Sequence, residues 1–328
     1  MMTITPFAWL RPTSVDEVLA ALGQHGADAL LVAGGTDAVP NLKHGLHEPK
    51  VVVHLGDVSE LHFVRDGEDG LHLGPLVTLA EIESHPLVRK HHAALAYAAG
   101  QVAGPQLRNM GTLGGNLCLD TRCTYYNQTY MWREAIGFCL KKDGEHCHVV
   151  PQGKRCVAAH SSDVAPMLIA LHSEVEIAGA EGRRTMAVED FFLADGAHNR
   201  VLKPGELVTR ILVPRSARGA HAAYRKLRPR GAIDFPMLSI AFAAHGIREL
   251  EEARLVVSAL AAKPKVVGGL DKLVRGKPAG EQVASAIAEA AYKQCRPQTN
   301  VPYDTWWRHE MVPVLVRRTV MKAFEGQT

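Results

Sequence analysis

Apolar residues near the start of the chain follow helical spacing in one stretch and form short continuous runs in two others. These patterns predict a helix over 14–25 and buried strands over 29–35 and 51–55. Ser14 and Glu17 have the spacing of a capping box, and Gly26 follows the last apolar position, where glycine commonly ends a helix. We therefore expect residues 1–57 to form a small lobe in which a helix packs on a short sheet.

The next part of the chain alternates strand-like and helix-like runs, and we expect it to form a second lobe over residues 58–217. Thr78 with Glu81 repeats the capping-box pattern at the start of a helix. The pattern predicts a strand followed by a helix over 71–85, a helix over 91–103, a glycine-punctuated extended piece over 104–117, a helix over 161–172, and strands over 173–179 and 205–214.

After the second lobe the order changes to strands first and helices afterwards. AYRKL, MLSIAFAAH and ARLVVSAL are strand-like runs, and amphipathic helices follow near 279–295 and 305–324. This order is typical of an α+β domain whose helices lie on one face of an antiparallel sheet. We expect a boundary between Pro214 and His221 and a C-terminal domain over residues 218–328.

Two glycine turns, AGGTD (33–37) and TLGGN (112–116), each adjoin an apolar run. Glycine lets a ligand approach the main chain closely, and successive free N–H groups form a nest for anionic oxygens. Neither turn has the lysine of a P-loop or the G-x-G-x-x-G pattern of a Rossmann turn. The turns are therefore either plain loops or two halves of a pyrophosphate site, which a dinucleotide such as FAD suits better than a mononucleotide.

One turn-rich segment holds four of the six cysteines, namely Cys123, Cys139, Cys147 and Cys156. Their spacing is wider than the close pairs typical of zinc sites, whereas a [4Fe–4S] cluster accepts four irregularly spaced thiolates. Three interpretations stay open at this point: an iron–sulfur cluster, a zinc site that also uses His146 or His148, and incidental thiols. Cys118 and Cys295 are expected to be packed structural thiols.

Composition narrows the class of protein. The 328 residues are 47% apolar and 22% charged with a net charge of +3, which argues against a dedicated nucleic-acid binder. No apolar run approaches the roughly 18 residues that span a bilayer, and the first residues lack a secretory-signal pattern. We therefore expect no membrane partner and a cytoplasmic location, where thiols stay reduced. Export with a twin-arginine partner would leave no mark in this sequence.

LVAGGTD, TLGGN and the later SDVAP together resemble the FAD-binding subunits of the xanthine dehydrogenase/molybdenum hydroxylase family, over nearly the whole chain. GGNLCLDTRCTYYNQ, GFCLKKDGEHCHVV and KRCVAAHSSDVAP look most like the β subunits of 4-hydroxybenzoyl-CoA reductases. The resemblance implies an α+β protein with a two-lobed FAD-binding domain of the PCMH/vanillyl-alcohol-oxidase type. It also implies a [4Fe–4S] loop inserted at about 118–158 and a C-terminal domain like that of CO dehydrogenase flavoproteins.

The resemblance further implies roles for single positions. Asp163 would accept hydrogen bonds from the nucleotide, or cap the helix that follows it. Lys226 would place positive charge near the flavin, or be a solvated strand lysine. Tyr224 and Asp234 are neighbours without an assigned role. The implied cofactor-binding residues are Leu31, Val32, Ala33, Gly34, Gly35, Thr36, Asp37, Ala38, Val102, Thr112, Leu113, Gly114, Gly115, Asn116, Asp163, Val208 and Lys226, and the implied cluster ligands are Cys123, Cys139, Cys147 and Cys156.

The function implied by the resemblance is that of an electron relay without catalytic residues of its own. Electrons from ferredoxin would pass through the [4Fe–4S] cluster and FAD to two [2Fe–2S] clusters on a small subunit. They would end at a molybdopterin cofactor on a large subunit, where a phenolic hydroxyl is removed to give benzoyl-CoA. The expected assembly is a dimer of heterotrimers. The alternatives are the FAD/[4Fe–4S] subunit of another molybdenum hydroxylase, such as an aldehyde oxidoreductase, and a non-catalytic zinc-stabilised binding module.

Overall fold

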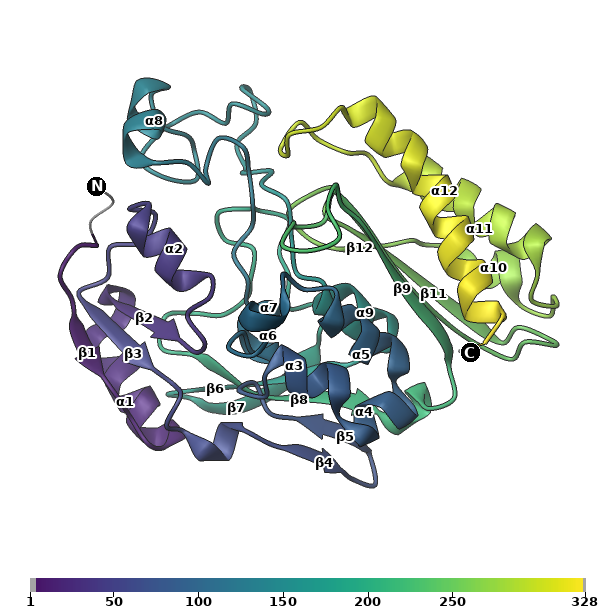
Figure 1. The fold of residues 1–328 in the computed structure, drawn as a ribbon, viewed down its shortest axis with the longest axis horizontal. Helices are drawn as coiled ribbons and strands as arrows, with labels where there is room; N and C mark the ends of the chain where they lie inside the picture. Colours follow the sequence, from purple (N-terminus) through teal and green to yellow (C-terminus); the bar gives the residue numbers. More distant parts are fainter. Residues whose placement is uncertain (1–3, 327–328) are drawn as a thin grey trace.

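A parallel three-stranded sheet begins the fold in the computed structural model, which describes residues 4–326 (Figure 1). The ends of the two predicted domains, residues 1–3 and 327–328, lie outside the described part. The strand order is β1-β3-β2, with β1 at Ala8–Leu10, β2 at Ala29–Val32 and β3 at Val51–His54. Both predicted strands are confirmed, although β3 is buried and β2 is mostly half-buried. The three-residue β1 is too short to leave a pattern.

Helix α1 (Val15–His25) packs its apolar side on this sheet. Ser14 accepts the N–H of Glu17, and Gly26 ends the helix with a positive φ of 52° that favours glycine. The predicted helix is therefore confirmed together with both of its ends. A short helix, α2 (Ala38–Lys43), follows the first glycine turn and was not predicted.

A five-stranded antiparallel sheet forms the second layer, in the order β4-β5-β8-β6-β7. Its strands are β4 Val64–Asp66, β5 Gly70–Leu73, β6 Glu174–Gly179, β7 Gly182–Ala187 and β8 Leu207–Pro214. A shared apolar core joins this sheet to helices α3 Leu79–Ser84, α4 Pro86–His91, α5 Ala93–Gly100 and α9 Val164–Ala170. Thr78 and Glu81 form the predicted capping box.

The prediction of an extended piece over residues 104–117 was wrong. This segment contains the short helices α6 (Pro105–Arg108) and α7 (Leu113–Leu117). Proline at the first helical position starts α6, and the Thr112 hydroxyl caps α7 by accepting the Gly115 N–H at 3.1 Å. Glycine-rich sequence does not favour helix, so local capping overrides the propensity that we used.

The C-terminal sheet is antiparallel in the order β12-β11-β10-β9, with β9 His221–Leu227, β10 Leu238–His245, β11 Glu252–Ser258 and β12 Lys265–Val266. Helices α10 Leu270–Val274, α11 Glu281–Gln294 and α12 Thr305–Phe324 share an apolar core with one face of it. Helices α5 and α9 contact the other face (Figure 1). The three predicted strands and two predicted helices are confirmed.

Residues 118–158 carry a single helix among their described residues, α8 (Tyr130–Ala135), and otherwise consist of turns. Figure 1 shows this segment standing away from the sheets, on the side where the N-terminal lobe faces the start of α12. Within residues 4–326, none of the helices is both long enough and apolar enough to cross a membrane.

Arg308 on α12 is fully buried and acts as the main polar anchor of the C-terminal domain. Its guanidinium donates to the carbonyl oxygens of Met237 at 3.0 Å, Ala259 at 2.8 Å and Gln298 at 2.8 Å. Burial lowers its pKa to about 10, so the group stays charged at neutral pH. The strand ends and the loop before α12 therefore depend on one cation for their hydrogen bonds.

Arg308→Met should lower the free energy of unfolding by about 3 kcal/mol or more, because three buried carbonyl groups lose their donor. The matched control is Arg317→Met on the same helix, whose pair with Glu281 is exposed and screened by solvent, so its loss should leave the free energy of unfolding nearly unchanged. Urea unfolding of both variants checks the prediction. Equal stability of the two variants would contradict it.

Candidate functional site

A cleft of about 910 Å³ is bounded by the N-terminal lobe, the second lobe and the edge of the C-terminal domain. Its volume is in the range of cofactor-binding pockets. The predicted cofactor-binding residues line this cleft with one exception, Leu113, which is fully buried in the core shared by the five-stranded sheet and its helices. One site therefore collects positions that lie as far apart in the sequence as Leu31 and Lys226.

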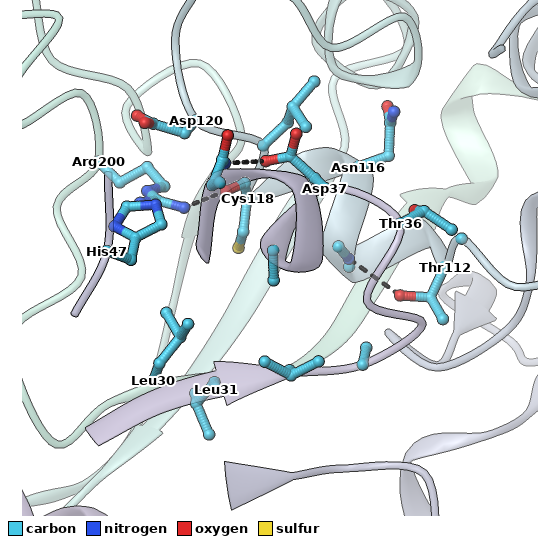
Figure 2. A pocket seen from close by; sticks show the side chains of 18 of the residues that line it. Leu30, Leu31, Thr36, Asp37, His47, Thr112, Asn116, Cys118, Asp120 and Arg200 are labelled. Carbon is cyan, nitrogen blue, oxygen red and sulfur yellow. Dashed lines mark hydrogen bonds between the residues drawn. The ribbon is translucent and has the colours of Figure 1, made fainter. Parts of the chain in front are cut away.

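The first glycine turn is pressed against the second lobe. A Cβ atom on Gly34 would lie 1.7 Å from the carbonyl oxygen of Met110, and Gly35 has a φ of +70°. Only glycine fits at position 34, because any side chain would push the two lobes apart. Figure 2 shows the result, with Thr36 of the first turn facing the same end of the cleft as Thr112 of the second.

The second turn is the start of helix α7, and its two glycines do different things. Gly114 is buried, and a Cβ there would lie 2.5 Å from the Cβ of Pro75. Gly115 is exposed and borders the cleft. The Ser162 hydroxyl donates to the side-chain oxygen Oδ1 of Asn116 at 2.8 Å, which fixes α7 to the start of α9. Gly114 is therefore a packing glycine, and Gly115 offers bare main chain to a ligand.

Asp163, Tyr224 and Lys226 form a buried cluster at the cleft wall. The Tyr224 hydroxyl donates to Asp163 Oδ1 at 2.6 Å, and Lys226 Nζ donates to Asp163 Oδ2 at 2.8 Å and to the Gln101 carbonyl at 3.1 Å. Burial raises the pKa of Asp163 and lowers the pKa of Lys226, and the pairing opposes both shifts. The lysine side chain is 1% exposed, so the alternative of a solvated strand lysine was wrong.

The helix-cap alternative for Asp163 was also wrong. Asp163 stands at the N-cap position of α9 with helical backbone angles, and its carboxylate is turned to Tyr224 and Lys226 instead. The Ser162 hydroxyl takes over the cap by accepting the Ala165 N–H at 3.0 Å. Asp163 joins the second lobe to strand β9, and this contact left no signal in the sequence because its partners are about sixty residues away.

The other end of the cleft carries charged residues that the sequence did not single out. Figure 2 shows His47 and Arg200 beside Cys118 and Asp120, away from the two threonines. Arg200 donates to the main-chain carbonyl of Cys118, and burial lowers the pKa of His47 while Asp120 opposes that shift. Asp234, one of the neighbours noted above, lies at the cleft and pairs with Arg230.

The four clustered cysteines meet in a second, smaller cavity. Their side chains are between 6% and 9% exposed, all four are free thiols, and all line this cavity together with Tyr126, Lys141 and His148. Burial raises the pKa of Cys123 to about 11 and that of Cys156 to about 12, although the Lys141 ammonium opposes the shift at Cys156. Buried, protonated thiols of this kind need a metal to hold them as thiolates.

The remaining cysteines lie elsewhere, as predicted. Cys118 borders the large cleft, where burial raises its pKa, and Cys295 is buried in the core of the C-terminal domain at the end of α11. Within residues 4–326 no three His, Cys, Asp or Glu side chains are close enough together to share a single metal ion. The four thiols thus surround a space rather than converge on one point.

Two arginines, one fully buried and one 12% exposed, fix the cysteine segment to the rest of the molecule. Arg133 is fully buried and donates to the main-chain carbonyls of His44 at 3.1 Å and Gly45 at 3.0 Å, in the N-terminal lobe. Arg122 pairs with Asp37 of the first glycine turn, and its guanidinium lies 4.5 Å from the ring of Phe235. The cysteine cavity is therefore held next to the cleft.

Comparison with known proteins agrees with this arrangement. The family model of the FAD-binding domain in molybdopterin dehydrogenase matches residues 5–216, and that of the CO dehydrogenase flavoprotein C-terminal domain matches residues 222–323. The chain belongs to this family. It is an FAD-binding subunit of the molybdenum hydroxylases, in which a mixed helix and sheet FAD-binding domain precedes a C-terminal domain.

Individual relatives carry the same subunit type. This FAD-binding subunit is 30% identical over 299 residues to the aldehyde oxidoreductase FAD-binding subunit of Escherichia coli K12, covering 87% of this chain and 89% of the relative. It is 27% identical to the carbon monoxide dehydrogenase medium chain of Hydrogenophaga pseudoflava, covering 97% of each. The solved carbon monoxide dehydrogenase of that organism superimposes with a TM-score of 0.82 at 25% identity, over 99% of each chain.

Gly34→Ala should abolish stable FAD binding and lower the free energy of unfolding by about 2 kcal/mol or more, because the added methyl group overlaps the Met110 carbonyl. The control is Gly23→Ala in α1, where a Cβ has open space and replacing glycine in a helix is neutral or stabilising. The flavin-to-protein ratio and urea unfolding test the pair. Stoichiometric flavin in Gly34→Ala would show that the two turns need not touch.

Proposed function

We propose that this subunit is an electron relay that holds FAD in the cleft and a [4Fe–4S] cluster in the cysteine cavity. The observation that carries the proposal is that Cys123, Cys139, Cys147 and Cys156 line one small cavity beside the cleft. Thirty-three residues separate the first and last of these cysteines, so their meeting is a property of the fold. An iron–sulfur cluster supplies one-electron transfer, and FAD connects one-electron to two-electron chemistry.

The residues present fit a cluster better than a single zinc ion. A zinc ion needs its four ligands at one point, about 2.3 Å from each sulfur, whereas a cube spreads four thiolates over its corners. The described residues offer no group of three or more such side chains around one point, yet all four thiols face one space. The alternative of a zinc-stabilised binding module also leaves the 910 Å³ cleft without a use.

The FAD would be held through main-chain contacts at its pyrophosphate and through packing around the rest of the molecule. Gly35, Thr36 and Gly115 present main chain to the cleft between the two turns. Val102 and Val208 line the wall, where we propose that they border the flavin ring. Asp163 and Lys226 would act as a pair, with the lysine placed by the carboxylate rather than free to move.

We propose that the subunit assembles with a large molybdenum subunit and a small [2Fe–2S] subunit, as a dimer of heterotrimers. The relatives named medium chain and FAD-binding subunit support this, because these names describe one component of a larger enzyme. Ferredoxin is the proposed donor of low-potential electrons. The chain's own part is to hold the two redox groups in order and to bury the four cysteine side chains that would bind the cluster.

The proposed reaction of the assembly is the reductive removal of the hydroxyl group of 4-hydroxybenzoyl-CoA. The resemblance of the segment around the four cysteines favours it. The second candidate is aldehyde oxidation, which the 30% identity to an aldehyde oxidoreductase FAD-binding subunit favours. The two candidates differ in the direction of electron flow and in the large subunit, so they can be separated by assay.

The discriminating experiment uses the complete enzyme, purified without oxygen together with its co-purifying subunits. The reductase proposal expects 4-hydroxybenzoyl-CoA to be converted to benzoyl-CoA with a low-potential one-electron donor. The oxidase alternative expects aromatic aldehydes to reduce an artificial acceptor. Turnover of aldehydes without any benzoyl-CoA formation would replace the first reaction by the second and leave the electron relay intact.

Cys139→Ser should remove the iron of the cluster and leave most of the FAD bound, because Cys139 lines the cysteine cavity and does not line the cleft. Cys295→Ser is the control, since that thiol is equally buried but lies in the C-terminal core. Iron analysis and the flavin absorption band measure both groups. Unchanged iron in Cys139→Ser would remove this cysteine from the ligand set.

A further inference from the structure

Lys141 stands at the boundary between the cleft and the cysteine cavity. Its side chain is 5% exposed and lines both spaces, as does Tyr126. The ammonium nitrogen lies 4.0 Å from the centre of the Tyr126 ring. Since Lys141 follows Cys139 by two residues, the turn that carries one predicted ligand also carries this cation. Neither the resemblance nor the cysteine pattern assigned Lys141 a role.

Three hydrogen bonds hold the ammonium group in one place. Lys141 Nζ donates to Asp120 Oδ1 at 2.8 Å, to the Thr121 hydroxyl at 2.6 Å and to the Thr121 carbonyl at 3.1 Å. All three donors of the ammonium are therefore used. Asp120 borders the cleft but not the cysteine cavity. Lys141 is thus the member of the pair that borders both spaces, and its charge acts on Cys156, whose pKa it lowers against the effect of burial.

A fixed buried charge of this kind acts strongly on a neighbouring redox group. Adding one electron to a [4Fe–4S] cluster makes it one unit more negative, without any bond being made or broken. A positive charge nearby lowers the energy of the reduced form, and the effect is large because few water molecules screen it in the interior. Hydrogen bonds and charges around the sulfur atoms are among the features that set cluster potentials.

We propose that Lys141 is a positioning residue that raises the reduction potential of the cluster and thereby sets how readily its electron moves toward the FAD. The proposal rests on the proposed function, because it needs a cluster in the cysteine cavity. The transfer is of one electron from the reduced cluster to the flavin, and an external one-electron donor of low potential replaces it. Asp120 and Thr121 act by fixing the ammonium group.

The test is an EPR-monitored redox titration of the cluster in the anaerobically purified enzyme, with iron and flavin quantified in each sample. Lys141→Met keeps the length of the side chain and removes its charge. At a fixed solution potential near the midpoint, we expect its ratio of reduced to oxidised cluster to fall about tenfold, which is ~59 mV for a one-electron couple. Iron and FAD content should match the unsubstituted enzyme.

The matched control is Lys142→Met. Lys142 is the next residue, is 25% exposed, pairs with Asp143 at 3.2 Å and does not border the cysteine cavity. The reduced-to-oxidised ratio of this variant should stay within about twofold of that of the unsubstituted enzyme, because solvent reaches the partly exposed ammonium group and screens its charge. If Lys142→Met shifted the midpoint potential of the cluster as much as Lys141→Met, the proposal would be overturned. The effect would then come from any nearby positive charge and not from the position of Lys141.

Asp120→Asn provides an independent variant of opposite sign. It keeps a hydrogen-bond acceptor for Lys141 but removes the negative charge, so the reduced fraction should rise. A normal iron content with no shift in Lys141→Met, or loss of iron in both Lys141→Met and Asp120→Asn, would overturn the proposal. Loss of iron in both variants would show that the pair of Lys141 and Asp120 stabilises the fold of the cysteine segment and does not tune the cluster. A cluster signal missing from the unsubstituted enzyme would instead contradict the proposed function.

Discussion

Three largely buried cations fix the cysteine segment, and the rest of the site depends on them. The apolar core of this segment consists largely of its own thiols with Tyr126, so hydrophobic packing cannot determine where it lies. Arg133 binds main-chain carbonyls of the N-terminal lobe, Arg122 pairs with the first glycine turn, and Lys141 pairs with Asp120. Burying such charges is costly unless each is paired and hydrogen-bonded, so the segment has one favourable position.

The position of the cysteine segment places the cysteine cavity beside the cleft. The cleft is formed where Gly34 lets one lobe touch the other, and the cysteine cavity is closed by Tyr126 and Lys141, which also line the cleft. The C-terminal domain completes the cleft through the buried pair of Asp163 and Lys226. Each contact joins elements that are distant in the sequence, and the two adjoining cavities are the arrangement that the proposed electron relay needs.

The sequence predicted the regular parts of the fold because their signals are local. The Ser14 cap, the Thr78–Glu81 capping box, the glycine that ends α1, and the strands and helices of the C-terminal domain follow from periodicity and end residues. The glycine motifs and the four cysteines also led to the two cavities. Short helices such as α7 were not predicted. The glycines of this segment disfavour a helix, and the helix forms because one hydroxyl group caps its first turn.

The sequence could not predict the pairings that give the site its charges. Asp163 and Lys226 were foreseen as separate contacts of a cofactor, whereas the structure uses each to bind the other. Arg133 and Lys141 look like surface residues in a polar, turn-rich stretch, yet both are buried. Nothing local marks a cation as buried when its partners are main-chain carbonyls, as for Arg133, or a carboxylate twenty-one residues away, as for Lys141.

The central claim is that one chain holds two redox groups in adjoining cavities. The most direct measurement is the quantification of iron, acid-labile sulfide, zinc and flavin in the enzyme purified without oxygen, together with its visible and EPR spectra. The account predicts one FAD and the iron and sulfide of one [4Fe–4S] cluster per copy of this chain, beyond what the partner subunits carry. Zinc at one atom per chain, with no iron assignable to this subunit, would contradict it.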